Sequence, residues 1–363
     1  MQIRILPLGC GSRAAVLLIA VGLTVYGGIR WVLGEEKAHA SKTAASAVNP
    51  PETFGKIERV DPALDKILPA DAKLQKLATG FDWSEGPVWL PAKKTLLFSD
   101  IPPNNILMWD PAGKKLTVFL HPASDIGSVK RGGEPGTNGL LLDKEGRLVT
   151  CEHGRRCVSR LEADGKRTVL ADKYNGKRLN SPNDAAYHSN GDLYFTDPPY
   201  GMEKGWDDPA RELDFCGVYR LSPDGKVTLL TKELSRPNGI AFSPDEKTLY
   251  VANSDPARPI WMAFDVESSG ELANGRVFFD ASAWAKGGRK GLPDGLKVDQ
   301  HGHVFATGPG GVHIFSPAGK HLGTIDTGEA TANCGWGEDG SVLYITADMH
   351  LGRIKTTTKG AGW

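Results

Sequence analysis

The sequence predicts an all-β fold, a six-bladed β-propeller whose blades are four-stranded antiparallel sheets. Three observations predict it: a short unit that recurs six times, an abundance of turn residues, and an unpaired strand before the first copy. The chain has 44 glycines and 24 prolines among 363 residues. Such a composition is typical of many short strands joined by turns, and it is unlike that of a helical bundle.

Each copy of the recurring unit contains a polar residue, a short apolar strand, a turn and a second apolar strand. In the fourth copy, Asn238-Gly-Ile-Ala-Phe242 precedes Lys247-Thr-Leu-Tyr-Val-Ala252. Most copies continue into a third strand, an Asp-Gly or Ala-Gly turn and a fourth strand, as in Val218–Leu230. Four short strands at a period of about 40–55 residues are the signature of a propeller blade. The six copies open at Glu85, Asn138, Asn183, Asn238, Asp294 and Asn333.

The two ends of this array predict how the ring closes. The last copy has only three clear strands and ends near Lys355, whereas an additional strand, Ala72–Ala78, precedes the first copy. We expect this N-terminal strand to complete the last blade, because the ring then has no exposed sheet edge at its seam.

The charge balance excludes some classes of partner. The chain has 43 basic and 43 acidic residues and a formal net charge of zero. A nucleic-acid-binding protein needs a basic field, so we expect no nucleic-acid partner. The hydrophobic content of 40% and the charged content of 24% are ordinary for a globular protein.

The N-terminal segment differs from the rest of the chain. The apolar run Ala14–Ile29 lies between basic residues, so residues 1–40 are predicted to be a signal peptide or an N-terminal membrane anchor. Ala38-His39-Ala40 resembles a cleavage site. Without cleavage, residues 14–33 would anchor the protein, and this anchor would be its one membrane contact. We therefore expect an exported protein, either periplasmic or extracellular.

The rest of the chain divides into a linker and one domain. Residues 41–56 are rich in Ala, Ser and Pro and are predicted to be a linker. Residues 57–363 are predicted to form the propeller. Export makes disulfides permissible, and Cys151 and Cys157 flank a predicted hairpin turn. A bridge between them and two free thiols both remain open.

The six opening residues would lie at equivalent positions at one mouth of the channel. All six have oxygen-bearing side chains, and two of them are acids. Such oxygens are the ligands that Ca²⁺ prefers, whereas Zn²⁺ would be expected to recruit imidazole or thiolate. The alternative is that Asn-Gly and Asp-Gly merely form turns. Glu85, a poor turn former, occupies the same register and favours a divalent cation: most simply Ca²⁺, with Mg²⁺, Mn²⁺ and Zn²⁺ as alternatives.

With these motifs the chain resembles the gluconolactonase, senescence marker protein and luciferin-regenerating-enzyme-like propellers. The resemblance extends from about Phe81 to Thr346, and the stretch Arg178–Gly201 is similar to the microbial gluconolactonase branch. The motifs are Glu85-Gly-Pro-Val-Trp89, Thr137-Asn-Gly139, Cys151-Glu-His-Gly154, Asn180-Ser-Pro-Asn-Asp184, Phe195-Thr-Asp-Pro-Pro-Tyr-Gly201, Pro237-Asn-Gly239 and Pro293-Asp-Gly295.

The resemblance implies a metal-dependent hydrolase of sugar lactones. It implies one catalytic divalent cation that polarises the lactone carbonyl and activates the attacking water. The family suggests Asp294 as both a ligand and the general base. A carboxylate that binds a cation is a weak base, so Asp184 is the second candidate. The implied metal ligands are Glu85, Asn183, Asn238 and Asp294.

Four residues are predicted to contact the substrate. Asn138 matches a polar position of the microbial branch, and Tyr200 follows a Pro-Pro pair in a loop that could form a pocket wall. His153 and Arg155 lie in a turn between two strands, where they either orient the substrate or form a solvated hairpin tip. Ser181 stands where the animal branch carries an arginine, so the sugar contacts of that branch do not carry over.

Other functions stay open. One is a lactonase or organophosphate-type esterase with a less polar substrate, and another is a non-enzymatic propeller scaffold that binds a partner on one face. The chain has no Gly-x-Ser-x-Gly elbow, which argues against a serine hydrolase. The sequence determines neither the particular lactone nor the oligomeric state.

Overall fold

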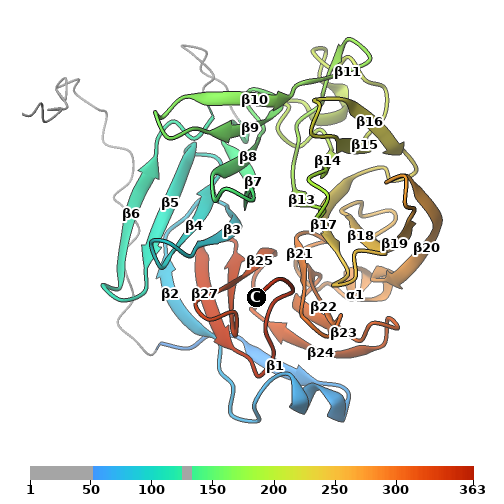
Figure 1. Cartoon of the computed structure of the whole chain (residues 1–363). Coiled ribbons are helices and arrows are strands. Elements are labelled where there is room, and N and C mark those ends of the chain that lie inside the picture. Colours follow the sequence, from blue (N-terminus) through green and yellow to red (C-terminus); the bar gives the residue numbers. More distant parts are fainter. Residues whose placement is uncertain (1–51, 125–132) are drawn as a thin grey trace, which may run out of the picture. The chain divides into compact units, whose positions relative to one another are not determined.

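The computed structural model describes residues 52–124 and 133–363, and these residues are almost entirely strands and turns. Within them, six antiparallel sheets form a ring, as Figure 1 shows, and the predicted six-bladed propeller is confirmed. The expected signal peptide or anchor lies outside the described residues. No helix in the described part of the chain is long and apolar enough to cross a membrane.

In each blade the first strand contacts the first strands of the two neighbouring blades, so these strands are the innermost ones. Blade one contains β3 (Ser84–Leu90), β4 (Thr95–Asp100), β5 (Asn105–Asp110) and β6 (Lys115–Leu120). Blade two contains β7 (Thr137–Leu142), β8 (Leu148–Glu152), β9 (Cys157–Leu161) and β10 (Arg167–Ala171). Blade three contains β13 (Ala185–Tyr187), β14 (Leu193–Asp197), β15 (Gly217–Leu221) and β16 (Val227–Thr231).

The remaining three blades follow the same order in the chain. Blade four contains β17 (Pro237–Phe242), β18 (Thr248–Asn253), β19 (Ile260–Val266) and β20 (Leu272–Asp280). Blade five contains β21 (Leu296–Val298), β22 (Val304–Gly308), β23 (Gly311–Phe315) and β24 (His321–Asp326). Blade six contains β25 (Thr331–Gly337), β26 (Val342–Ala347), β27 (His350–Lys355) and β2 (Gln75–Thr79).

The N-terminal strand closes the ring, as predicted. β2 pairs antiparallel with β27, with Gln75 opposite Arg353 and Thr79 opposite His350. Blade six is thus built from both ends of the propeller domain, and its outermost strand comes from the start of the chain. The seam is therefore covered by main-chain hydrogen bonds rather than left as a free edge.

A second N-terminal strand, not expected from the repeat, lies on blade five. β1 (Lys56–Arg59) pairs antiparallel with β24 and gives this sheet a fifth strand. Thr53 forms an isolated bridge with Gln75, so the last residues of the expected linker lie against the propeller. The 3₁₀ helix η1 (Pro62–Lys66) follows β1, and its N-cap Asp61 accepts a hydrogen bond from Ala63 N.

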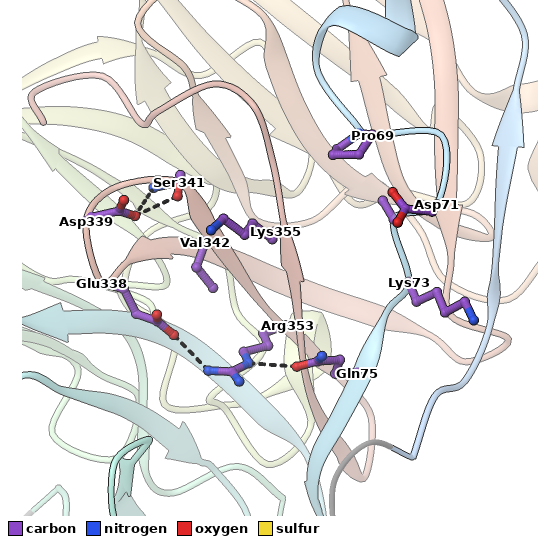
Figure 2. A pocket seen from close by; sticks show the side chains of 11 residues that line it. Pro69, Asp71, Lys73, Gln75, Glu338, Asp339, Ser341, Val342, Arg353 and Lys355 are labelled. Atoms are coloured by element: carbon purple, nitrogen blue, oxygen red, sulfur yellow. Dashed lines mark hydrogen bonds and ion pairs between the residues drawn. The ribbon is translucent and has the colours of Figure 1, made fainter.

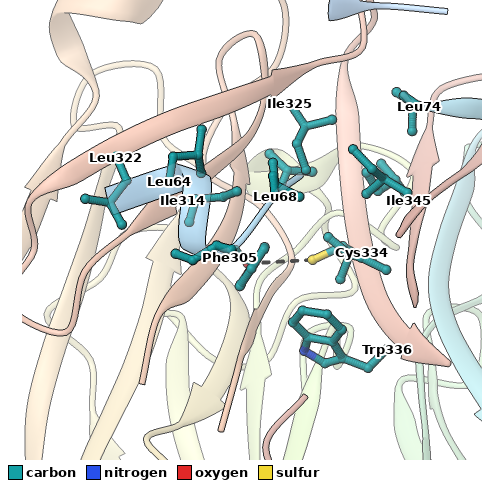
Figure 3. Close-up of a cluster of buried hydrophobic side chains, with 14 of the residues drawn as sticks. Leu64, Leu68, Leu74, Phe305, Ile314, Leu322, Ile325, Cys334, Trp336 and Ile345 are labelled. Atoms are coloured by element: carbon teal, nitrogen blue, oxygen red, sulfur yellow. Dashed lines mark hydrogen bonds between the residues drawn. The ribbon is translucent and has the colours of Figure 1, made fainter. Parts of the chain in front are cut away.

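The helix η1 covers the core between blades five and six. Leu64 is fully buried and lies in one cluster with Leu68, Phe305 and Trp336 (Figure 3). The short segment between β1 and β2 thereby connects the two blades through apolar packing as well as through strand pairing.

The cores between blades contain aromatic side chains. Six aromatic residues at strand positions are at most 6% exposed: Trp89, Trp109, Phe195, Tyr250, Phe305 and Tyr344. Two short helices and a small hairpin lie outside the six blades and η1 in the described residues: η2 (Gly205–Asp207), α1 (Ser282–Lys286), and β11 (Lys173–Tyr174) with β12 (Lys177–Arg178).

The four cysteines in the described residues are buried free thiols. Cys151 lies opposite Val158, and Cys157 lies opposite Glu152. The two residues that could have formed a bridge across the hairpin are therefore not paired in register.

Candidate active site

The innermost strands begin around a cavity of about 310 Å³. Its volume lies at the lower end of the range of small-molecule sites. Five of the six residues that open the repeats line it, together with Tyr200. The lining residues are Trp83, Glu85, Glu134, Asn138, Asn183, Tyr200, Asn238, Ser254, Gly291, Leu292, Asp294, Ala330 and Thr331.

Breaks in strand pairing occur where the site residues lie. The register between β3 and β4 shifts after Glu85. The register between β7 and β8 shifts at Asn138, and the register between β17 and β18 shifts at Asn238. Asn183 and Asp294 precede the first paired residues of β13 and β21. A bulge or an unpaired strand end redirects side chains. Apart from Glu85, the residues at these five equivalent positions are therefore not paired within their sheets, and the polar side chains of all five line the cavity.

The glycines that follow these polar residues allow neighbouring blades to approach. A Cβ on Gly139 would lie 2.7 Å from the carbonyl oxygen of Asn183, and a Cβ on Gly239 would lie 2.3 Å from that of Asp294. Both glycines lie in strands rather than in hairpin turns. Close approach of the backbones, and not turn formation, accounts for the Asn-Gly pairs at these two positions.

Hydroxyl groups of the second strands hold the inner strands of the next blade. Ser99 Oγ donates to the Asn138 carbonyl oxygen at 2.8 Å, and Thr196 Oγ1 donates to that of Asn238 at 2.7 Å. Thr307 Oγ1 donates to the Ala332 oxygen at 2.8 Å. The sequence interpretation missed these positioning residues. The sequence signal for them was a Ser or Thr at the next-to-last position of the second strand, which occurs in four of the blades.

Two of the acids that line the cavity, Glu85 and Asp294, lie in a poorly solvated environment. Glu85 is 1% exposed, and burial raises the pKa of its carboxyl, helped by the negative charge of Asp184. Burial, and then the charge of Glu85, raises the pKa of Asp294 well above its ordinary value. Two carboxylates in such a place repel each other and need a positive partner to be ionised together.

The residues present fit a hard cation. The side-chain oxygens Oδ1 of Asn138, Asn183 and Asp294 are buried and have no hydrogen-bond partner among the described residues. Leaving a buried acceptor unpaired costs about 1–3 kcal/mol, so oxygens that converge without donors favour a ligand. In the described part of the chain no three His, Cys, Asp or Glu side chains cluster as metal ligands. A cation here would therefore depend on amide oxygens as well as the two acids.

Glu85 is oriented across the seam of the ring. Its Oε2 accepts hydrogen bonds from Gly86 N at 2.7 Å and from Asn333 Nδ2 at 3.0 Å. Asn333, the sixth residue of the predicted ring, thus supports Glu85 rather than lining the cavity. Oε1 is the oxygen of Glu85 that these bonds leave available to a cation.

Asp184 does not line the cavity. Its side chain is buried, Oδ1 accepts from Ala185 N at 2.9 Å, and Lys297 Nζ lies 3.9 Å from Oδ2. Burial raises its pKa, while the charge of Lys297 opposes this shift. As a candidate base Asp184 therefore lacks the contact with the cavity that Asp294 has.

Two of the predicted substrate contacts, His153 and Arg155, do not line the cavity. His153 is fully buried and its Nδ1 lies 3.2 Å from Glu134 Oε2, so it is not a solvated hairpin tip. Arg155 is partly exposed, and its Nη1 lies 3.5 Å from Glu152 Oε1. Tyr200, by contrast, lines the cavity, and its hydroxyl donates to the Ser254 carbonyl oxygen at 2.8 Å.

Glu134 is a cavity residue that the sequence interpretation missed. It lies three residues before β7, outside the repeating register, in the segment Gly132-Gly133-Glu134-Pro135-Gly136. The available signal was an acid enclosed by glycines and proline directly before a site motif.

A larger hollow, of about 540 Å³, lies at the other end of β25, between β2, β27 and the turn before β26 (Figure 2). One of its charged side chains, Arg353, donates to Glu338 Oε1 at 2.8 Å and to Gln75 Oε1 at 3.0 Å. None of the described residues that line it has a buried polar side-chain atom without a partner. The smaller cavity, with its unpaired oxygens, is therefore the candidate site.

Comparison with known proteins shows the family of the chain. A family model described as "SMP-30/Gluconolactonase/LRE-like region" matches residues 83–348. The chain belongs to this family. It is 40% identical over 316 residues to the gluconolactonase of Zymomonas mobilis, covering 85% of this chain and 88% of that protein. It is 27% identical to the pentonolactonase XacC of Haloferax volcanii, covering 72% and 80% of the two chains.

Solved structures of family members superpose on the propeller. The structure of a gluconolactonase from Xanthomonas campestris has a TM-score of 0.74 and 34% identity, covering 88% of this chain and 100% of that chain. The calcium-binding protein regucalcin from Agrobacterium tumefaciens has a TM-score of 0.61 at 21% identity and shares the fold. The family match covers all seven motifs named above, because they lie between residues 83 and 348.

Proposed function

We propose that this chain is a lactone hydrolase of the carboxylic ester hydrolase class, and that its substrate is a sugar lactone of the gluconolactone type. The observation that carries the proposal is the cavity in which Glu85 and Asp294 meet the unpaired amide oxygens of Asn138 and Asn183. The 40% identity to a gluconolactonase supports the reaction class, and the pentonolactonase relative supports a lactone of a sugar acid.

The proposal includes a divalent cation held by Glu85, Asn183, Asn238 and Asp294. Relatives named regucalcin, such as that of Oryctolagus cuniculus at 26% identity, suggest a divalent cation. The oxygen-only ligand set favours Ca²⁺ over Zn²⁺, with Mg²⁺ and Mn²⁺ as alternatives. When bound, the cation would polarise the lactone carbonyl and stabilise the negative charge that develops on its oxygen.

The chain's own residues would orient the substrate and move protons. Hydrolysis adds water to the lactone carbonyl carbon, breaks the ring C–O bond, and returns one proton to the departing ring oxygen. Asp294 Oδ1 is buried, unpaired and in the cavity, so it is the carboxylate oxygen placed to accept the proton of the attacking water. Asn138 and Tyr200 line the cavity where the ring hydroxyls would lie.

The proposed export of the protein rests on the sequence alone. The signal peptide or anchor falls within residues 1–51, outside the described residues. A periplasmic or extracellular location remains part of the proposal, and fractionation of cells that produce the full chain would test it.

The test is hydrolysis of glucono-δ-lactone, corrected for spontaneous opening, by protein stripped with a chelator and reloaded with single cations. We expect the activity to disappear on stripping and to return with one of them. Asp294→Asn should lower kcat by about 10²–10⁴-fold, the usual contribution of a positioned base. Asp71→Asn, an exposed acid that lines the other hollow, is the matched control. Hydrolysis that is indifferent to both the chelator and Asp294→Asn would refute the proposal.

A further inference from the structure

The strongest unassigned feature of the cavity is the pair Glu134–His153. Glu134 lines the cavity, and its side chain is 32% exposed, so it can reach a ligand. His153 lies behind it, fully buried, with Nδ1 3.2 Å from Glu134 Oε2. Neither ring nitrogen of His153 has a hydrogen bond in the described part of the chain. The contact with Glu134 is therefore the one polar interaction that the structure gives this ring.

The segment that carries Glu134 is fixed by its backbone. His153 N donates to the Gly136 carbonyl oxygen at 3.0 Å, Gly154 N donates to that of Pro135 at 3.1 Å, and Gly136 N donates to that of Ile101 at 3.2 Å. The proline restricts the backbone directly after Glu134. Blades one and two thus both hold the chain directly after Glu134, which reduces the entropy lost when its carboxylate binds a ligand.

The loop on the other side of His153 carries a second cavity residue. A Cβ on Gly201 would lie 2.3 Å from the Cβ of His153, so glycine is needed for the loop to pack against the ring. The neighbouring Tyr200 lines the cavity and is anchored to Ser254. His153 therefore fills the space between Glu134 and the Tyr200 loop and determines how far apart these two cavity walls stand.

We propose that Glu134 is a substrate-specificity residue that accepts a hydrogen bond from a lactone hydroxyl, and that His153 is its positioning residue. This inference rests on the proposed lactone hydrolysis and deepens it. Glu134 is not among the residues proposed to bind the cation, so its carboxylate is left for the organic ligand. The charged side chains lining the cavity in the described part of the chain are Glu85, Glu134 and Asp294, all acidic. The pair would thereby select neutral, hydroxyl-bearing lactones over deoxy and anionic ones.

The preference depends on how the Glu134 carboxylate interacts with the substrate: it attracts a hydroxyl and repels a negative charge. A hydrogen bond from a neutral hydroxyl to a carboxylate is stronger than one between neutral groups. A lactone that lacks this hydroxyl leaves the carboxylate without its bond, and a lactone that carries a carboxylate or phosphate is repelled by it. The preference is thus a property of ground-state binding, which should change KM more than kcat.

The test compares wild type with Glu134→Gln, which keeps the size of the side chain and removes its charge. Three substrates are used: glucono-δ-lactone, δ-valerolactone as the hydroxyl-free ring, and 6-phosphoglucono-δ-lactone as the anionic one. We expect Glu134→Gln to raise KM for gluconolactone by about 10- to 100-fold, while kcat changes by no more than about threefold. KM for δ-valerolactone should not change, and kcat/KM for the phosphorylated lactone should rise.

His153→Gln tests the positioning role. We expect a smaller rise in KM for gluconolactone than in Glu134→Gln, and little additional loss in the double variant, because the two residues act as one unit. All three variants should still bind the cation in titration calorimetry, which separates this role from loss of the fold or of the metal site. The two variants without the Glu134 charge should bind it somewhat more weakly, because that charge acts on Glu85 and Asp294. Asp71→Asn is the control for the removal of one negative charge.

The outcomes separate this inference from the proposed function. If wild type hydrolyses no lactone, the proposed function fails and the inference fails with it. If wild type hydrolyses gluconolactone but Glu134→Gln leaves KM unchanged, or raises KM equally for δ-valerolactone, the inference is wrong and the proposed function stands. Turnover that drops about 100-fold or more while KM stays unchanged would also overturn it, because Glu134 would then act in the chemical step.

Discussion

The effect of Glu85→Gln on the free energy of unfolding should depend on whether the cation is bound. Without it, Glu85 is an acid with 1% exposure that faces the neighbouring acids Asp184 and Asp294. The amide keeps an acceptor oxygen for Gly86 N and Asn333 Nδ2, which now bind Oε2. The substitution therefore removes the buried charge and leaves its hydrogen bonds in place. We expect the variant to be more stable than wild type in a chelator.

In chelator, the stability advantage of Glu85→Gln over wild type should grow as the pH rises. The pKa of Glu85 is raised in the folded protein above its ordinary value of 4.5. The unfolded chain therefore releases this proton first, and wild type loses stability as the pH rises from 4.5 through the folded pKa. In chelator the advantage of Glu85→Gln should be near zero at pH 4.5 and about 2–3 kcal/mol at pH 8, since one pKa unit corresponds to about 1.4 kcal/mol and the acids share the effect.

The cation should remove most of this advantage of the variant. A ligand at about 100 times its Kd stabilises the folded state by about 2.7 kcal/mol. If the loss of one of two ligand charges weakens binding about 100-fold, the same concentration stabilises Glu85→Gln by only about 0.4 kcal/mol. The assay is urea unfolding at pH 4.5 and pH 8, with chelator and with each cation, and Asp71→Asn is the charge control. Equal stabilisation of wild type and variant by every cation, with no difference in chelator at pH 8, would refute the assignment of Glu85.

Two further predictions concern parts of the fold away from the cavity. His313 is fully buried, and its pKa is lowered from 6.5 to about 3, first by burial and then by the charge of His321. As the pH falls, this histidine is therefore protonated in the unfolded chain before it is protonated in the folded protein. The free energy of unfolding should then fall below pH 6.5 by up to about 1.4 kcal/mol per pH unit. His313→Phe should remove this component from urea unfolding measured between pH 7 and pH 4, and an unchanged slope would contradict it. Leu64→Ala, in η1, should lower the free energy of unfolding by about 2–4 kcal/mol in the same assay. Val60→Ala, at a side chain that is 61% exposed, should leave it almost unchanged. Equal losses of stability in the two variants would show that η1 does not hold blades five and six together.

The repeat in the sequence was sufficient to predict the blades because each strand pair is encoded locally. Alternating apolar residues and Gly-containing turns recur in every copy, and neighbouring strands of one blade are close in sequence. The closing strand β2 could be predicted for a different reason, since a blade with three strands leaves an edge that must be covered. The ring of Glu85, Asn138, Asn183, Asn238 and Asp294 followed from their common position in the repeat.

The features that were missed depend on contacts that no local pattern encodes. β1 pairs with β24, a strand more than 250 residues away in the chain, and its sequence Lys56-Ile-Glu-Arg59 has no feature of the repeat. Glu134 reaches the cavity from outside the register, so a search by equivalent positions could not find it. The bulges at Glu85 and Asn238 are defined by pairing register, which is determined by the assembled sheet.

Closure of the ring and orientation of the site are connected through one hydrogen bond. Asn333 belongs to blade six, the blade that is completed by the N-terminal strand β2, and its Nδ2 reaches Glu85 Oε2 in blade one at 3.0 Å. The proposed cation ligands come from blades one, three, four and five, so blade six contributes none of them. It contributes the donor that fixes Glu85 instead. The packing of blade six against blade one that closes the ring therefore also places the donor that orients Glu85, and we expect the closed propeller to be the form that binds the proposed cation.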